Sequence, residues 1–324
     1  MRVLIIGCTG FIGRSVAARA SARDLEVFGT GRSPEPHSFF HGRYLCSDRN
    51  DPDQVLRFVR DYDISVVVDM IPMVQSSTRS LLARLDTEIE QYVMISSADV
   101  YANYNLIRRR CSGTVFPGAA DESSALRQHL YPYRKTSPRP ARDPDRYLDD
   151  YDKIPLEAEV RKMSSSWTIL RLPMVYGPGD PQDRFAWAID PMLRKCRELT
   201  IPSPWAAWVT THGYIENVSH AIASSLANPL AYEQVFNIAE ETPVSQLTWA
   251  RRFAAVLDWH GEIRLTDDPT HPMSERIAQL DLTVPLKIDG ARIRTTLGVA
   301  DVVNQADALS RTVASTTAAQ IQGV

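Results

Sequence analysis

The sequence predicts an α/β fold in which a doubly wound parallel sheet is followed by a smaller C-terminal domain. Through the first half of the chain, short apolar runs rich in β-branched residues alternate with amphipathic stretches, which is the pattern of consecutive β-α-β units. A glycine-rich stretch directly follows the first apolar run. Beyond Gly177 the chain becomes rich in proline and tryptophan and less regular, as expected of a smaller domain that caps the sheet.

The order of the predicted elements supports this fold class. Near-continuous apolar runs are typical of strands buried on both faces. Strands are predicted at Val3–Ile6, Glu26–Thr30, Arg43–Cys46, Ser65–Asp69, Tyr92–Ser96 and Thr168–Leu172, with a further strand at Gln234–Ile238. Helices are predicted at Ile12–Arg23, Pro52–Asp61, Ser76–Leu85 and Pro155–Met163.

The composition excludes several classes of protein. The 324 residues carry 36 Lys and Arg against 39 Asp and Glu, and 44% of them are hydrophobic. Such a chain is long enough to bury a large core, and its balanced charge gives no general attraction to nucleic acid or anionic membranes. The longest apolar run near the start, Val3–Ile6, is too short for a signal sequence or a membrane span. We therefore expect a cytoplasmic protein that binds neither nucleic acid nor membrane.

The four cysteines and seven histidines are scattered along the chain. The cysteines form no close pair, so neither a disulfide framework nor a CxxC site is expected. The histidines lack the spacing of metal ligands, so we assign no metal.

One long segment, from Ala102 to Asp150, has no sustained period and is rich in Pro, Arg and Ser. It contains a run of cations with no acid between them, namely Arg127, Arg134, Lys135, Arg139 and Arg142. Long irregular segments of this kind are often functional, so the run could bind an anionic substrate. A solvated loop is the equally acceptable interpretation.

The glycine-rich stretch is the first feature that indicates chemistry. It reads Gly7-Cys8-Thr9-Gly10-Phe11-Ile12-Gly13 and lies between a predicted strand and a predicted helix. Glycines at such a turn let the backbone approach a pyrophosphate, and the helix N-terminus offers it free N–H groups. The candidate cofactor contacts are Gly7, Thr9, Gly10, Phe11, Ile12 and Gly13.

The ends of the next two strands bear on the choice of dinucleotide. NAD sites usually place an acid after the second strand to hold the ribose, but this chain has Arg32 and Ser33 there. These two residues would accept a 2′-phosphate, which favours NADP, with NAD still possible. Asp48, after the third strand, is positioned to accept a hydrogen bond from adenine, although it could instead cap the following helix in competition with Asp51.

At this point the sequence resembles the extended short-chain dehydrogenase/reductases, specifically the NAD-dependent epimerase/dehydratase family. Besides the glycine-rich turn, the matching motifs are Ile95-Ser96-Ser97-Ala98-Asp99-Val100-Tyr101, Leu170-Arg171-Leu172-Pro173-Met174-Val175-Tyr176-Gly177-Pro178-Gly179, Tyr214-Ile215-Glu216-Asn217-Val218, Phe236-Asn237-Ile238 and Leu297-Gly298. The resemblance implies a Rossmann-type NAD(P)-binding domain over residues 1–175 and about 213–240. A substrate-binding domain would then comprise residues 176–212 and 241–324.

The resemblance also implies further contacts and a homodimer. Arg49, Met70, Ile71, Lys153 and Pro173 would contribute to the cofactor site. In this family a Ser or Thr, a Tyr and a Lys act together: the phenol moves the proton, and the ammonium lowers its pKa and binds the nicotinamide ribose. Ser97 and Lys153 fall on the Ser and Lys positions.

The chain departs from the family at the catalytic tyrosine, because Asp149 occupies the position four residues before Lys153. Two phenols lie nearby, Tyr147 and Tyr151. Pro155 is tolerated only in the first turn of a helix, so the helix is expected to begin at about Lys153. Tyr151 would then precede the helix and is free to face Lys153. We take Tyr151 as the leading acid/base candidate, with Asp149 second and Tyr147 third.

These residues lead us to expect an NAD(P)-dependent oxidoreductase or epimerase that transfers hydride at a secondary alcohol or ketone of a sugar-like, polyhydroxylated or anionic substrate. Trp205, Trp208 and His212 belong to the segment expected to face that substrate. Two alternatives remain. Asp99 lies where dehydratases of the family carry a catalytic Glu, which allows a dehydratase. The displaced tyrosine allows a non-catalytic NAD(P)-binding sensor or scaffold.

Overall fold

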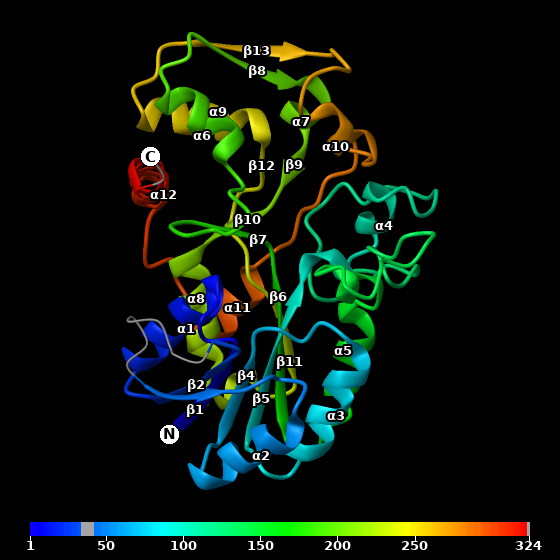
Figure 1. Cartoon of the computed structure of the whole chain (residues 1–324), viewed down its shortest axis with the longest axis vertical. Coiled ribbons are helices and arrows are strands. Elements are labelled where there is room, and N and C mark those ends of the chain that lie inside the picture. The colour runs from blue at the N-terminus through cyan, green and yellow to red at the C-terminus, as the bar shows by residue number, and fades with distance from the viewer. Residues whose placement is uncertain (34–41, 323–324) are drawn as a thin grey trace.

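The computed structural model describes residues 1–33 and 42–322 and has a seven-stranded parallel sheet at its centre (Figure 1). The strand order is β11-β6-β5-β4-β1-β2-β3, and every neighbouring pair is parallel. The strands are β1 (Arg2–Ile6), β2 (Glu26–Gly31), β3 (Arg43–Cys46), β4 (Val66–Asp69), β5 (Gln91–Ser97), β6 (Ser166–Leu172) and β11 (Gln234–Asn237). The predicted α/β class and all seven predicted strands are confirmed.

Helices cover both faces of this sheet (Figure 1). One face carries α1 (Phe11–Ser21), α8 (Ile215–Ser225) and α11 (Ala291–Leu297), and the other carries α2 (Pro52–Asp61), α3 (Gln75–Leu85) and α5 (Lys153–Val160). The four predicted helices are confirmed to within a few residues at their ends. This is the doubly wound arrangement of a Rossmann-type fold.

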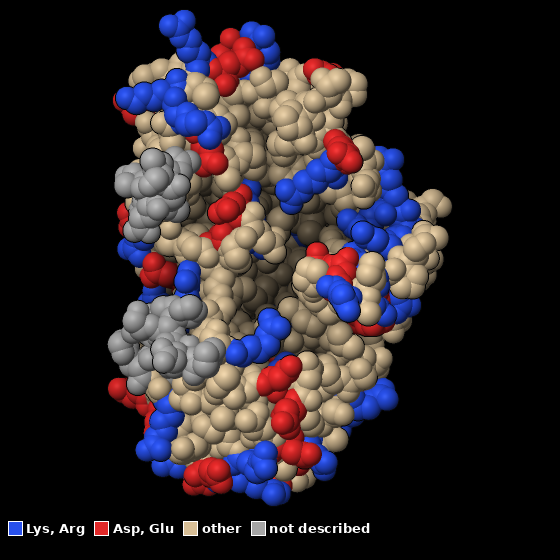
Figure 2. Space-filling model, viewed as in Figure 1, with Lys and Arg blue, Asp and Glu red and all other residues tan. Residues whose placement is uncertain are grey.

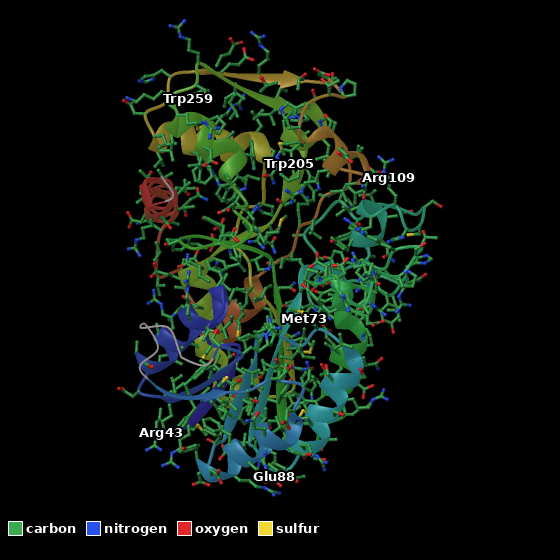
Figure 3. The ribbon with its side chains drawn as sticks, in the orientation of Figure 1. Arg43, Met73, Glu88, Arg109, Trp205 and Trp259 are labelled. Carbon is green, nitrogen blue, oxygen red and sulfur yellow. The ribbon has the colours of Figure 1, made fainter. Side chains whose placement is uncertain are left out.

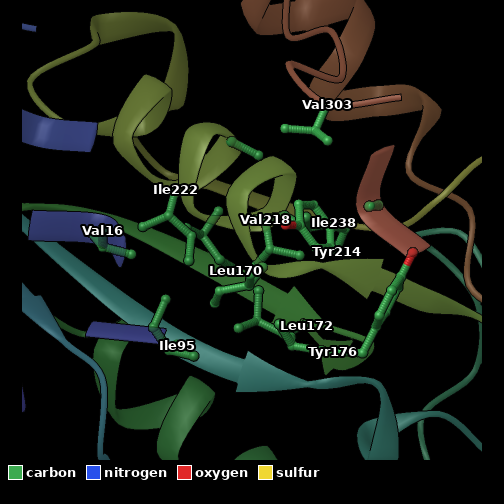
Figure 4. Close-up of a cluster of buried hydrophobic side chains, with 14 of the residues drawn as sticks. Val16, Ile95, Leu170, Leu172, Tyr176, Tyr214, Val218, Ile222, Ile238 and Val303 are labelled. Atoms are coloured by element: carbon green, nitrogen blue, oxygen red, sulfur yellow. The ribbon is translucent and has the colours of Figure 1, made fainter. Parts of the chain in front are cut away.

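Alternation along each strand explains the two layers of core. In β1, Val3 and Ile5 belong to the cluster beneath α1 and α8, whereas Leu4 and Ile6 belong to the cluster beneath α2 and α3. Figure 4 shows part of the first cluster, where Ile222 of α8 lies over Leu170 of β6. Both faces of each central strand are therefore excluded from solvent, as its near-continuous apolar sequence requires.

Two helix starts matter for the site. Asp51 caps α2 by accepting a hydrogen bond from the Gln54 amide at 3.0 Å, with Pro52 in the first turn. Asp48 is therefore not the cap. Asp152 caps α5 in the same way, accepting from the Ile154 amide at 2.9 Å, and the helix begins at Lys153. Both starts follow the preference for Asp before a helix and Pro in its first turn.

A second lobe lies beyond the carboxyl edge of the sheet (Figure 1). It contains α6 (Ala186–Leu193), β8 (Glu198–Pro202), α7 (Ser203–Ala207), β9 (Val209–Thr210), β12 (Val244–Ser245), α9 (Gln246–Val256), β13 (Glu262–Thr266) and α10 (Ser274–Ala278). The parallel pair β7 (Met174–Tyr176) and β10 (His212–Tyr214) joins the lobes, and α12 (Gln305–Gln322) packs against α6 and α9. The chain enters this lobe after β7 and returns through β10 to α8 and β11. The proposed domain boundaries follow that path and stay a prediction.

The segment between residues 102 and 150 is mostly irregular, as its sequence indicates. It includes only α4 (Asn103–Ile107) and the 3-10 helix η2 (Arg146–Asp149), while the 3-10 helices η1 (Ala98–Val100) and η3 (Pro229–Ala231) lie outside it. None of the described helices is both long and apolar enough to cross a membrane.

Candidate active site

The glycine-rich turn forms a tight cradle between β1 and α1. Gly7 has a φ of +82°, a conformation that side-chain-bearing residues rarely adopt. A Cβ on Gly13 would lie 2.2 Å from the carbonyl oxygen of Gly7, so the helix can approach the turn only because residue 13 has no side chain. Gly10 is the N-cap of α1 and has no side-chain cap. The N-terminus of α1 is thus available to an anion.

Next to the cradle, a cavity of about 390 Å³ opens at the carboxyl ends of β1, β2, β3 and β4. Cofactor sites of α/β proteins lie at this edge, where strand order reverses. The cavity is lined by Ile6, Gly7, Thr30, Gly31, Arg32, Ser47, Asp48, Arg49, Asn50, Ile71, Met73, Val74, Ser77 and Tyr147. Gly7, Arg32, Asp48, Arg49 and Ile71 are candidates from the sequence, and Tyr147 from the distant irregular segment is an unforeseen neighbour.

The other sequence candidates for cofactor contact do not line this cavity, and the structure gives each of them other neighbours. A Cβ on Gly31 would come within 3.0 Å of Thr9 Oγ1, and one on Gly7 would touch Met70 and Ile71. The Ser33 carbonyl accepts a hydrogen bond from Tyr44 at 2.9 Å. Phe11 and Ile12 open α1, and Pro173 packs beside Gly213.

Arg49 and Asp48 have internal partners that define their orientation. Arg49 is only 5% exposed, and its Nε donates to Asp69 Oδ2 at 2.7 Å. The positive charge of Arg49 is therefore neutralised within the protein. Asp48 Oδ1 accepts from the Asn50 amide at 2.8 Å.

The structure brings Tyr151, Asp99 and Lys153 together. The Tyr151 hydroxyl donates to Asp99 Oδ2 at 3.0 Å, and Tyr151 is only 8% exposed. Lys153 Nζ lies 5.5 Å from the centre of the Tyr151 ring. It donates to the carbonyls of Pro72 at 2.6 Å and Ile95 at 3.0 Å. An ammonium has three N–H groups, so one remains for a further acceptor.

Ser97 ends β5 and borders the same cluster. Its hydroxyl oxygen accepts from the Asp99 amide at 3.2 Å and so caps η1. It also acts on the phenol, because a hydrogen bond with Ser97 opposes the rise in the pKa of Tyr151 that burial and Asp99 produce. The Ser97, Tyr151 and Lys153 side chains therefore meet at the carboxyl end of β5.

The two other candidates for the missing tyrosine lie elsewhere. Asp149 is an ion-pair partner of Arg139 and Arg146, and it also accepts from the Arg139 amide at 2.7 Å. These contacts hold the pKa of Asp149 below its ordinary value. Tyr147 lines the cavity described above. Of the three candidates, Tyr151 is the one that joins Lys153.

Ion pairs on both sides of Tyr151 fix its position. Asp152 forms a fully buried pair with Arg127, and Asp150 pairs with Arg134 at 3.3 Å. Asp149 pairs with Arg139. Three arginines of the basic run therefore form ion pairs within the protein, with the acids that flank Tyr151 in the chain. The anion-binding interpretation of that run is not supported for these three arginines, which instead hold the irregular segment against the start of α5.

Burial changes the protonation chemistry of the cluster. It raises the pKa of Asp99, against the opposing effects of Arg127 and of the hydrogen bond from Tyr151. It lowers the pKa of Lys153 to about 8. Burial, followed by the charge of Asp99, raises the pKa of Tyr151 well above its ordinary value. These are the perturbations that burial and close charges produce at functional sites.

Sequence reasoning missed two further phenols. Tyr133 donates to Asp99 Oδ2 at 3.3 Å, and its hydroxyl lies 2.8 Å from that of Tyr104. The Tyr133 and Tyr151 rings meet edge to face at 5.3 Å. Both missed residues come from the irregular segment, where no periodicity indicates which side chains turn inward.

On the face shown in Figure 2 the surface is hollowed between the two lobes, and the visible floor of the hollow is largely uncharged. Met73 lies at the sheet edge below this region and Trp205 in the lobe above it (Figure 3). Trp205 and Trp208 pack against each other at 5.4 Å, and Trp208 donates to the Val284 carbonyl. They are chiefly part of an apolar cluster that includes Ile107.

His212 is buried. It packs between aromatic rings, including Phe185 and Trp249. Burial lowers its pKa to about 3, so the imidazole is neutral near pH 7. In the part of the chain that the structure describes, no three potential ligands among His, Cys, Asp and Glu are grouped to hold a metal.

A comparison with protein families finds a match that includes the glycine-rich turn. Residues 3–93 match the NAD dependent epimerase/dehydratase family. The match runs from β1 into β5 and thus contains the glycine cradle and the lining of the cavity apart from Tyr147. The resemblance to the NAD dependent epimerase/dehydratase family is confirmed over this part of the chain. The cluster of Ser97, Asp99, Tyr151 and Lys153 lies beyond it.

Solved structures share the fold of the whole chain. UDP-glucose 4-epimerase from Thermotoga maritima, solved with UDP-glucose, has 16% identity and a TM-score of 0.72, covering 99% of this chain and 100% of that one. A putative epimerase from Burkholderia cenocepacia J2315 has 18% identity and a TM-score of 0.71, with 98% of each chain covered. UDP-glucuronic acid 4-epimerase from Bacillus cereus, solved with UDP-glucuronic acid and NAD, has 19% identity and a TM-score of 0.69, covering 98% and 100%. No curated protein sequence matches the chain.

Proposed function

We propose that the chain is an NAD(P)-dependent enzyme that transfers hydride at a secondary alcohol or ketone of a sugar-like substrate, with Tyr151 as the acid/base. The observation that carries this proposal is the meeting of Tyr151, Ser97 and Lys153 at the end of β5. Tyr151 does not follow the usual sequence spacing, but its contacts provide the phenol, hydroxyl and ammonium that the chemistry requires.

The described residues fit a nicotinamide dinucleotide. The close approach of Gly13 to Gly7 leaves room for a pyrophosphate at the N-terminus of α1, and the cavity of about 390 Å³ beside it is large enough for an adenosine. Arg32, Asp48 and Tyr147 would contact that end, and the free N–H of Lys153 would bind the ribose. When bound, the cofactor accepts or returns a hydride at its nicotinamide ring.

Each side chain of the cluster then has a distinct task. Ser97 donates a hydrogen bond to the substrate oxygen and orients it. Tyr151 Oη takes the hydroxyl proton during oxidation and gives it back during reduction. Lys153 is charged near pH 7 and would hold the ribose. Its charge also favours the ionised form of Asp99, which burial disfavours. The largely uncharged hollow between the lobes would receive the rest of the substrate.

The substrate class is proposed from the solved neighbours. Two of them were solved with UDP-glucose or UDP-glucuronic acid, and we propose a polyhydroxylated substrate of this kind for this chain. Retention of the ketone followed by hydride return to its other face gives epimerisation, whereas release of the ketone gives net oxidation.

The test is hydride transfer by purified protein with a panel of UDP-sugars, free sugars and ketones. We expect Tyr151→Phe to reduce kcat by about 100-fold or more, because the proton transfer loses its donor and acceptor. Tyr131→Phe, in the same segment but outside the cluster, is the matched control and should retain activity. Unchanged turnover in Tyr151→Phe would contradict the proposed role. Cofactor binding without turnover on any substrate would instead favour the sensor or scaffold.

We propose NADP as the preferred cofactor, because Arg32 lies exposed at the rim of the cavity where NAD sites usually carry an acid. The neighbour from Bacillus cereus holds NAD, which makes the preference a question of relative affinity. We expect Arg32→Asp to weaken NADPH binding by about tenfold, since one phosphate contact is lost and a repulsive charge is added. NADH binding should change little. The measurement is the ratio of the Kd values for NADPH and NADH, obtained by nicotinamide fluorescence. An equal loss of affinity for both cofactors in Arg32→Asp would exclude a contact between Arg32 and the 2′-phosphate.

Dehydration is the second candidate, favoured by one observation. Asp99 is buried and its pKa is raised, which suits a group that gives up a proton. Product analysis separates the two reactions, because only dehydration yields a product that lacks one water.

A further inference from the structure

We propose that Asp99 receives, through Tyr151, the proton that is removed from the substrate, and that Tyr133 and Tyr104 hold the Asp99 carboxyl group in place for this transfer. The inference rests on the proposed function and deepens it. It makes Tyr151 a relay between substrate and carboxylate rather than the final proton acceptor.

The geometry forms a continuous hydrogen-bonded path. Tyr151 Oη lies 3.0 Å from Asp99 Oδ2, and Tyr133 Oη lies 3.3 Å from the same oxygen. Tyr104 Oη lies 2.8 Å from Tyr133 Oη. The Tyr133 ring also packs edge to face against the rings on either side of it, at 5.3 Å from Tyr151 and 6.1 Å from Tyr104. Asp99 Oδ2 is therefore fixed between two phenols.

The Asp99 carboxyl group has no ion-pair partner among the described residues. Arg127 is the nearest candidate, but its Nε donates to the main-chain oxygen of Asp99 at 2.8 Å, and its terminal nitrogens bond to Asp152. Asp99 Oδ1 makes no hydrogen bond to any described group. A buried carboxylate with so little compensation can readily take up a proton.

Other charged groups facing the path act more weakly. Lys153 favours the ionised form of Asp99, and Asp152 disfavours it. The Arg108 guanidinium lies 5.4 Å over the Tyr133 ring. Burial, then the charge of Asp99, raises the pKa of Tyr133 well above its ordinary value, and the same two causes raise the pKa of Tyr104 to about 12. The three phenols therefore stay protonated near pH 7, and Asp99 is the group that changes charge.

The high pKa of Tyr151 explains why a relay is needed. A tyrosinate beside an ionised Asp99 would place two negative charges 3.0 Å apart in a buried site, which is strongly unfavourable. Two linked transfers avoid this state. The substrate O–H bond breaks as a new O–H bond forms at Tyr151 Oη, and the original Tyr151 O–H bond breaks as Asp99 Oδ2–H forms. The hydride, with its electron pair, goes to the nicotinamide. Reduction reverses every step.

The test compares the pH dependence of kcat/KM for oxidation in wild type, Asp99→Asn and Tyr151→Phe. In wild type, activity should rise with pH as Asp99 ionises. In Asp99→Asn we expect a loss of about 100-fold near pH 7, with residual activity that no longer shows the acid limb. Asp99→Glu should restore part of the activity at neutral pH. An Asp99→Asn profile that keeps the wild-type shape and height would overturn the relay.

A second readout needs no cofactor. Ultraviolet difference titration of the cofactor-free protein follows tyrosinate formation, and removal of the Asp99 charge should let additional phenols ionise at lower pH in Asp99→Asn than in wild type. Tyr133→Phe should move the acid limb of the activity profile up by about one pH unit, since the ionised carboxylate loses a hydrogen bond. Tyr131→Phe should leave the activity profile unchanged, and it should remove one phenol from the titration without shifting the others. Identical titration curves in wild type and Asp99→Asn would contradict the coupling.

The outcomes separate this inference from the proposed function. Loss of activity in Tyr151→Phe with a wild-type profile in Asp99→Asn would retain the enzyme and remove the relay. Full activity in Tyr151→Phe would remove both. Thermal unfolding curves establish that each variant is folded before its activity is compared.

Discussion

Lys153 combines a positive charge with almost complete burial, and this determines the pH at which the site works. The side chain is 4% exposed, and burial lowers its pKa to about 8, although Asp69 and Asp99 favour the charged form. The two backbone carbonyls that accept from Nζ hold the ammonium at a fixed position. Lys153 is therefore charged at neutral pH, but its pKa of about 8 lies only a little above that pH.

The lowered pKa of Lys153 predicts that activity falls at alkaline pH. As pH rises through about 8, Lys153 loses its proton and with it the charge that holds the ribose and opposes desolvation of Asp99. The value of kcat/KM should therefore fall by about tenfold per pH unit above this point. Lys153→Met should lose activity at every pH and abolish the limb. A wild-type profile that stays flat through pH ~9.5 would show that the ammonium is not required.

The element that matters most is the junction between the irregular segment and α5. Asp152 accepts hydrogen bonds from Arg127, from the Tyr131 amide at 2.5 Å and from the Ile154 amide that begins the helix. Its side chain and that of Arg127 are both fully buried. The Asp152 carboxylate, next to Tyr151 in the chain, thus caps α5. It also anchors the irregular segment that carries Tyr133.

We expect Asp152→Ala to lower the free energy of unfolding by about 3–5 kcal/mol, because it leaves Arg127 buried without its partner and removes the helix cap. The matched control is Asp150→Ala, whose pairs with Arg134 and Arg146 are about half exposed. That change should cost less than about 1 kcal/mol. Urea unfolding measures both; equal costs would show that the buried pair does not anchor the junction.

At the scale of the whole molecule, the site lies at the carboxyl edge of the sheet, which is the edge that faces the second lobe (Figure 1). Local patterns sufficed to predict the sheet, since every β-α-β unit carries its own alternation. They did not reveal the parallel pairing of β8 with β13, because the two strands lie far apart in sequence and β13 has no buried residue. Non-local pairing of this kind leaves no short-range signal.

The candidate site was predictable where a local rule constrained the backbone. Gly7 and Gly13 follow from the strand-turn-helix pattern, and Tyr151 follows from the effect of Pro155 on the start of α5. Tyr133 and Tyr104 could not be found, and neither could the place of Tyr147 beside the cavity, because these positions depend on how the irregular segment folds back over the sheet. The pairing of Arg139 with Asp149 shows the same limit, since the sequence alone left the basic run open to a ligand.

The account depends most on the position of Tyr151 relative to the cofactor, and a crystal structure with bound NADPH measures it directly. We expect Tyr151 Oη and Ser97 Oγ to face the nicotinamide ring, with Lys153 Nζ within hydrogen-bond distance of the ribose. The Tyr151–Asp99 hydrogen bond should persist. A complex in which the Tyr151 ring faces away from the nicotinamide, with another group beside the ribose and the reacting carbon, would contradict the account.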